Sequence, residues 1–114
     1  MANQIKMYRG DSYPILFTLT DSQTKVPINL VDATITMTID KRRGPLDATT
    51  QVFQVEGIID PDPTTGRVTF TPRSTDTDQP TGLYYYDISI TDPRITKRTV
   101  AKSTFLISMD ISKD

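Results

Sequence analysis

Hydrophobic and polar residues alternate with a period of two along much of the chain. In the clearest run, residues 33–41, isoleucine or methionine alternates with threonine. Because successive side chains of a β-strand point to opposite faces, this alternation is typical of a strand with one buried face. The same pattern predicts further strands at 12–20, 67–71 and 83–91.

Weaker alternation fills the gaps between these runs. It predicts strands at 51–59, where Gly57 marks a bulge or bend, and at 97–107. An edge strand is expected at 4–8, paired near the C-terminus. The total of about seven short strands is typical of an immunoglobulin-like sandwich.

The connections between these strands are rich in Pro, Gly and Asp, which favour turns over helices. No segment has apolar residues at helical spacing over three turns. The unpatterned segments 42–50 and 72–81 are expected to be exposed and mobile. The sequence therefore predicts an all-β, immunoglobulin-like antiparallel sandwich, with residues 1–114 as one domain and a core within 4–110.

Charge and composition narrow the range of partners. The chain has 13 basic and 14 acidic residues, so it lacks the strongly basic face expected of a nucleic-acid-binding protein. No apolar stretch has the length of a membrane helix, and the first residues do not resemble a signal peptide. We therefore expect neither nucleic-acid nor membrane partners, and synthesis in a cytoplasm.

The sequence offers few residues that are suited to catalysis. His and Cys are absent, which removes the commonest general base and the thiolate nucleophile. Carboxylate pairs cleave glycosidic bonds in other proteins, but the aspartates fall in turn-like segments, where Asp bonds the backbone. These are Asp21, Asp60, Asp62, Asp76, Asp78 and Asp92. We predict a protein that is not an enzyme and uses no cofactor.

Among metal ions, calcium is the more reasonable candidate, because Asp60-Pro61-Asp62 and Asp76-Thr77-Asp78 bring hard oxygen ligands together. Neither cluster has the glycine and terminal glutamate of an EF-hand loop. We predict no metal site, and a loop calcium site stays open as the alternative.

Arg9-Gly10-Asp11 spells the tripeptide that integrins recognise. It lies between the expected edge strand and the first strong strand, where Gly and Asp favour a turn. A turn is therefore the preferred interpretation of this motif, and cell adhesion is the alternative.

The run Tyr84-Tyr85-Tyr86 places tyrosines on alternate faces of one strand. Tyr84 and Tyr86 are expected in the core, with their hydroxyl groups reaching a rim or a backbone acceptor. Tyr85 then faces outward, where exposed aromatic residues favour protein contacts. The residues predicted to contact a partner are Tyr85 and, on the edge strand, Gln4, Lys6 and Tyr8.

Five motifs follow one another along the chain. They are Arg9-Gly10-Asp11-Ser12-Tyr13-Pro14-Ile15, VPINLVDATITMTI (26–39), GRVTF (66–70), GLYYYDI (82–88) and TVAKSTFLI (99–107). This order is similar to the immunoglobulin-like domain at the N-terminus of phage baseplate upper proteins, and to related phage tail and virion proteins. The resemblance extends from about Met7 to Asp110.

The resemblance implies a sandwich that holds protein neighbours in a virus particle, without cofactor or catalysis. In baseplate proteins a linker and a receptor-binding part follow this domain, whereas this sequence stops at Asp114, so receptor binding is not carried over. We expect a structural, protein-binding module of a phage tail, baseplate or other part of the virion. Its partners would be other virion proteins or further copies of itself. A carbohydrate-binding or adhesion module of a viral particle is the alternative.

Overall fold

Strands make up nearly all of the regular structure. The computed structural model describes residues 4–21, 23–42, 50–92 and 95–109. The strands are β1 (Ile5–Tyr8), β2 (Ile15–Thr18), β3 (Thr34–Asp40), β4 (Gln51–Glu56), β5 (Ile58–Ile59), β6 (Arg67–Phe70), β7 (Gly82–Asp92) and β8 (Ile95–Ser108). A 3₁₀ turn, η2 (Pro63–Thr65), and a one-turn helix, α1 (Ser74–Thr77), complete the described elements.

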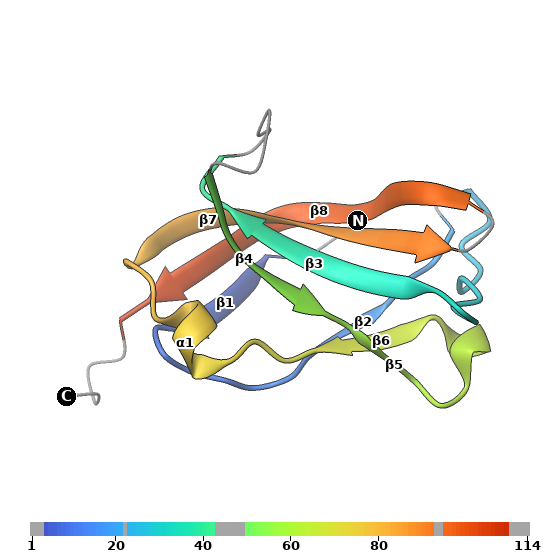
Figure 1. The fold of residues 1–114 in the computed structure, drawn as a ribbon, viewed down its shortest axis with the longest axis horizontal. Helices are drawn as coiled ribbons and strands as arrows, with labels where there is room; N and C mark the ends of the chain where they lie inside the picture. Colours follow the sequence, from blue (N-terminus) through green and yellow to red (C-terminus); the bar gives the residue numbers. More distant parts are fainter. Residues whose placement is uncertain (1–3, 22, 43–49, 93–94, 110–114) are drawn as a thin grey trace.

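The strands form two sheets that face each other (Figure 1). The larger sheet has the order β1-β8-β7-β3-β4, and the smaller sheet has the order β2-β6-β5. β1 runs parallel to β8, and the other pairs are antiparallel. The prediction of an all-β sandwich is confirmed. Eight strands are described where about seven were expected, and the immunoglobulin-like topology stays a prediction.

The core lies between the two sheets and follows the alternation in the sequence. Ile35, Met37 and Ile39 of β3 are buried, and the threonines between them lie on the outer face. Val68 and Phe70 supply the opposite layer from β6. Burial of these alternate side chains is the main force that holds the sheets together.

Gly57 marks the point where the chain leaves one sheet for the other. The single strand predicted at 51–59 is in fact two strands, β4 in the larger sheet and β5 in the smaller one. The Gly57 N–H donates to the Ile35 carbonyl over 2.8 Å. A Cβ at this position would come within 2.4 Å of Val68 Cγ2, so only glycine fits the crossing.

The segment 72–81 differs from its prediction. It was expected to be exposed and without helix, but α1 occupies its middle, and Pro72 and Thr77 are buried. The Thr77 hydroxyl donates to the Asp11 carbonyl over 2.7 Å, and the Ser12 hydroxyl donates to the Pro72 carbonyl over 2.6 Å. These bonds fix the segment against the stretch before β2. A helix of one turn is too short to leave a periodic signal.

One further prediction needs adjustment, and another is not tested. η2 is a second short helical turn in a connection that was expected to hold turns alone. Of the segment 42–50, residues 43–49 lie outside the described part of the chain.

Candidate functional site

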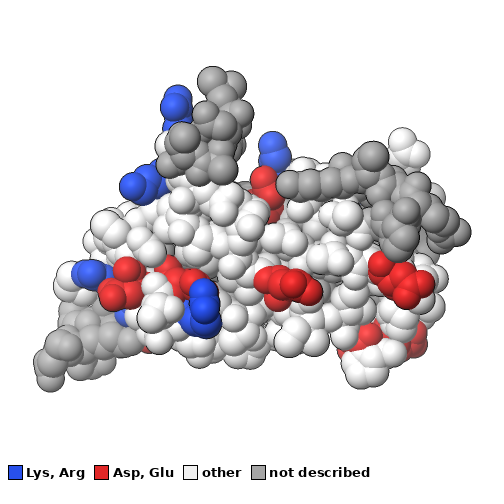
Figure 2. Space-filling model, in the orientation of Figure 1, with Lys and Arg blue, Asp and Glu red and all other residues white. Residues whose placement is uncertain are grey.

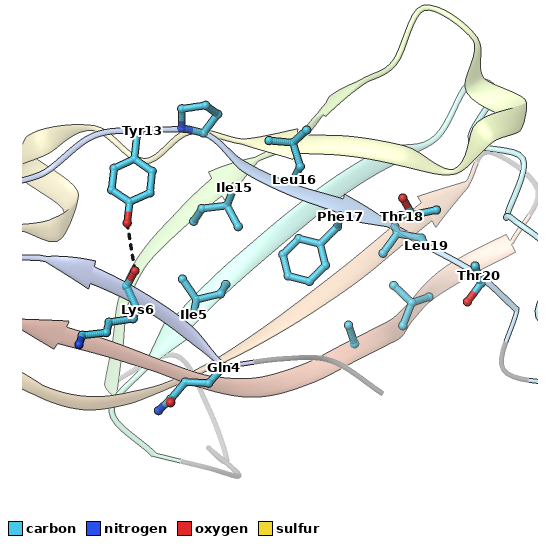
Figure 3. Close-up of a pocket in the computed structure, with 13 residues that line it drawn as sticks. Gln4, Ile5, Lys6, Tyr13, Ile15, Leu16, Phe17, Thr18, Leu19 and Thr20 are labelled. Carbon is cyan, nitrogen blue, oxygen red and sulfur yellow. Dashed lines mark hydrogen bonds between the residues drawn. The ribbon is translucent and has the colours of Figure 1, made fainter.

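A groove opens on one side of the sandwich, between β2 and the adjoining parts of β1 and β8 (Figure 3). Its volume is about 560 Å³, within the range typical of ligand-binding pockets. The lining residues are Gln4, Ile5, Lys6, Tyr13, Pro14, Ile15, Leu16, Phe17, Thr18, Leu19, Thr20, Val100 and Ala101. The groove is thus a lateral opening of the sandwich that leads toward its core.

The inner surface of this groove is apolar. Ile15, Phe17, Val100 and Ala101 are only partly buried, although all four pack against the core. The Phe17 ring meets Phe70 edge-on, with ring centroids 5.9 Å apart. The two sheets therefore leave part of their shared apolar layer accessible from the side.

One end of the groove is bridged by a hydrogen bond. The Tyr13 hydroxyl donates to the Lys6 carbonyl of β1 over 3.1 Å (Figure 3). This contact connects the segment before β2 to β1. The bridge limits the opening at that end and leaves the length beside Phe17 accessible.

β2 is an edge strand, and one backbone hydrogen bond, together with the β2–β6 register, shows which of its N–H and C=O groups face β6. The Leu19 N–H donates to the Gly66 carbonyl over 2.8 Å, and the β2–β6 register pairs Phe17 with Val68. Because hydrogen-bonded pairs alternate along an antiparallel ladder, Phe17 points its backbone groups at β6. The N–H and C=O of Leu16 and Thr18 therefore point away from β6, and no described strand pairs with them there.

The outer face of the smaller sheet carries two exposed aliphatic side chains in one row. Thr69 is the register partner of Leu16 on one side and of Ile58 on the other. Leu16 is 73% exposed and Ile58 is 72% exposed. These side chains extend the apolar surface from the groove around β2.

The structure separates the residues predicted to contact a partner. Gln4 and Lys6 line the groove, although the Lys6 side chain leads away from it in Figure 3. Tyr8 is exposed further along β1. Tyr85 lies half-buried on the outer face of the larger sheet, opposite Thr104 of β8. The groove itself was not predicted, because it combines three distant parts of the chain. The sequence feature that could have indicated it is the absence of charged residues from the strand predicted at 12–20.

Arg9-Gly10-Asp11 forms a turn that is attached to the segment around α1. The Asp11 N–H donates to the Tyr8 carbonyl over 3.0 Å, and Gly10 has a positive φ of 81°. The Arg9 guanidinium pairs with Asp78 over 3.0 Å. This geometry differs from the flexible loop tip that integrin recognition needs, and it matches the turn interpretation.

The aspartates of the two calcium candidates support their own loops. Asp60 and Asp62 accept backbone N–H groups of Asp62 and Thr64 at 3.0 and 3.1 Å. The Thr64 hydroxyl and N–H lower the pKa of Asp62. In the second cluster, Asp76 accepts the Arg73 N–H over 2.9 Å. Within the described ranges, no three His, Cys, Asp or Glu side chains gather as a metal site would require.

Tyr84 and Tyr86 lie in the core, as expected from the alternation. The Tyr84 hydroxyl donates to the Pro80 carbonyl over 2.6 Å, and burial raises the pKa of Tyr84 while the charge of Arg9 opposes the rise. Burial raises the pKa of Tyr86 to about 12, and a hydrogen bond with Ser103 opposes this shift. Both phenols are neutral at physiological pH, so they serve packing and hydrogen bonding.

Charged side chains form no dominant patch on the face shown in Figure 2, where groups of both signs are scattered among uncharged ones. No helix in the described part of the chain is long and apolar enough to cross a membrane. No protein-family model matches the chain, and no curated protein matches it significantly.

Proposed function

We propose that the chain is a non-catalytic, protein-binding module of immunoglobulin-like fold that docks into a larger assembly, as a component of a phage tail or baseplate. The observation that carries the binding role is the open side of the sandwich. There an edge strand, whose outward backbone groups pair with no described strand, borders an accessible part of the apolar core. Exposed edges and apolar patches are the features by which all-β modules bind neighbours.

The order of the strands supports the immunoglobulin-like assignment. β3, β7 and β8 lie side by side in one sheet, as strands C, F and G do in that fold. β2, β6 and β5 form the other sheet, as strands B, E and D do.

Tyr84 supports the same assignment. It lies near the start of β7, and its hydroxyl bonds the backbone four residues upstream, at Pro80. Such a tyrosine corner is a hallmark of immunoglobulin-like sandwiches.

The absence of His and Cys supports a non-catalytic role, because it removes the commonest general base and the thiolate nucleophile. The carboxylates of the two aspartate clusters have structural hydrogen bonds of their own. The virion part of the proposal rests on the resemblance of the motif order to phage baseplate and tail proteins.

Incorporation into particles tests this proposal. The tagged chain is expressed during infection of the host from which the sequence derives, and density-purified particles are analysed by quantitative mass spectrometry. We expect a fixed number of copies per particle. The variant Leu16→Lys should reduce incorporation, whereas Thr75→Lys, an exposed change on α1, should not. A chain that is absent from particles would contradict the virion role.

A further inference from the structure

We infer that the groove is an acceptor site for a single extended strand of another polypeptide, which pairs with the edge of β2 that no described strand covers and completes the sandwich. This inference rests on the proposed binding role and names the kind of partner. Addition of a strand to an open edge is a recognised mode of peptide binding, in which main-chain bonds give affinity and alternate side chains fill pockets.

The backbone of β2 supplies the hydrogen-bonding half of this site. Leu16 and Thr18 point their N–H and C=O groups away from β6, toward the open side. Two donors and two acceptors at this spacing match the backbone of one added antiparallel strand. Pro14 lacks an N–H, so the pairing edge begins after it.

The walls of the groove supply the side-chain half. Ile15 and Phe17 face inward from β2 (Figure 3), and Val100 and Ala101 line the groove from β8. β1 covers β8 only along Phe105–Ser108, so these small β8 residues have no described strand beside them on that side. Alternate side chains of an added strand would pack between the two walls and bury the accessible part of the core.

The charge of the groove restricts the sequence of its occupant. Among the described residues that line it, Lys6 is the only charged one, and its side chain leads away in Figure 3. A charged side chain inserted between apolar walls would lose its hydration without a partner. The inward-facing residues of the added strand must therefore be neutral and apolar.

The size of the groove favours one strand over a second copy of the domain. A stable protein–protein interface uses about 20–30 residues on each side. Thirteen described residues line the groove, three of them in the short stretch Gln4–Lys6. This surface suits a short extended segment and is too small to hold a globular partner by itself.

Selection from a displayed library of random linear peptides tests the inference with the purified domain as bait. We expect selected peptides with neutral apolar residues at alternate positions. In ¹⁵N-labelled protein, chemical shift changes should centre on Leu16, Thr18, Val100 and Ala101. Replacement of an inward-facing apolar residue of the peptide by lysine should abolish binding.

Thr18→Pro and Thr18→Val form a matched pair of variants. Proline removes the outward N–H, which β6 does not use, and weakens peptide binding by about tenfold for one lost hydrogen bond. Valine keeps the N–H and the branched shape, so its binding should equal that of the unchanged chain. If Thr18→Pro does not fold, the shift map and the lysine-containing peptide decide the question.

Three results would overturn the inference. They are a library without binders, peptides whose shift changes lie on the outer face around Ile58, and a domain that self-associates through β2. If the domain binds no peptide in the groove, the virion role is still tested by particle incorporation, because a virion module can dock by another surface. Conversely, peptide binding by a chain that is absent from particles would retain the strand acceptor and reject the virion role.

Discussion

Some single side chains of this sandwich both fill the core and hold a connection between strands in place. Tyr84 of β7 is buried in the core, and its hydroxyl donates to the Pro80 carbonyl over 2.6 Å. It thereby holds the connection between β6 and β7 to the strand that follows. A hydrogen bond of this kind contributes about 1 kcal/mol to stability when the alternative is an unpaired acceptor.

The variant Tyr84→Phe tests that contribution. It keeps the ring in the core and removes only the hydroxyl, so the free energy of unfolding should fall by about 1 kcal/mol. Urea denaturation measures the change. Tyr8→Phe is the matched control, because Tyr8 is exposed on β1 and should tolerate the change without measurable loss. Equal effects of the two variants would contradict the role given to Tyr84.

Tyr86 makes stability depend on pH in alkaline solution. Its pKa is about 12 in the folded chain, compared with the usual 10.0. Between these values the unfolded chain loses the phenol proton while the folded chain keeps it, so the free energy of unfolding falls as pH rises. Below pH 10.0 this contribution is fully present.

Tyr86→Phe should therefore show a shallower loss of stability across that pH window than the unchanged chain. Denaturation curves on each side of pH 10.0 give the comparison. The two proteins differ at this one position, so the difference in slope reports Tyr86. Parallel pH profiles would contradict the raised pKa.

Two contacts between elements depend on close packing or on a specific hydrogen bond. The first is the crossing at Gly57, where a Cβ would come within 2.4 Å of Val68 Cγ2 and 2.8 Å of Phe70 Cε1. Both neighbours are fully buried in a close-packed layer, so neither has room to move. The second is α1, whose Thr77 bonds the Asp11 carbonyl before β2.

Gly57→Ala should destabilise the chain by about 1–3 kcal/mol, the usual cost of overpacking a core. Val68→Ala removes the nearest clashing methyl group. The double variant should therefore lose less stability than the sum of the two single variants. Calorimetry of the four proteins measures this coupling, and strict additivity would show that the crossing is not packed as described.

Thr77→Val should cost about 1–2 kcal/mol, because the isosteric change removes the buried hydroxyl that donates to the Asp11 carbonyl. Thr75→Val, at an exposed position of the same helix, is the control and should have little effect on stability. Thermal unfolding of both variants measures the difference. If α1 holds the segment before β2 in place, Thr77→Val lowers stability more than Thr75→Val; equal effects would show that α1 only covers the surface.

The sequence predicts some of these elements better than others for physical reasons. Alternation is a local property, so β3 and β7 could be located from their own residues. The division of 51–59 into β4 and β5 depends on the pairing partners of each half, which alternation does not encode. Gln4 and Lys6 could be selected as predicted contact residues from the edge strand alone, but the groove that they line also needs β2 and β8 beside it.

At the scale of the whole molecule, the described part of the chain is a sandwich that is closed by packing on most sides and open along β2. Antiparallel sheets usually protect such edges with charges, bulges or covering loops. β2 carries no charged residue, and its neighbour across the groove is an uncharged part of β8. An edge left unprotected in this way favours pairing with another chain, and the account of function depends on it.

Residue-resolved hydrogen exchange of the isolated domain tests this open edge most directly. The amide protons of Leu16 and Thr18 point away from β6, so we predict that they exchange almost as fast as in an unfolded chain. Those of Phe17 and Leu19 are bonded across to β6 and the adjoining Gly66, and should be strongly protected. Equal protection of all four amides would show that the edge of β2 is already covered and would contradict the account.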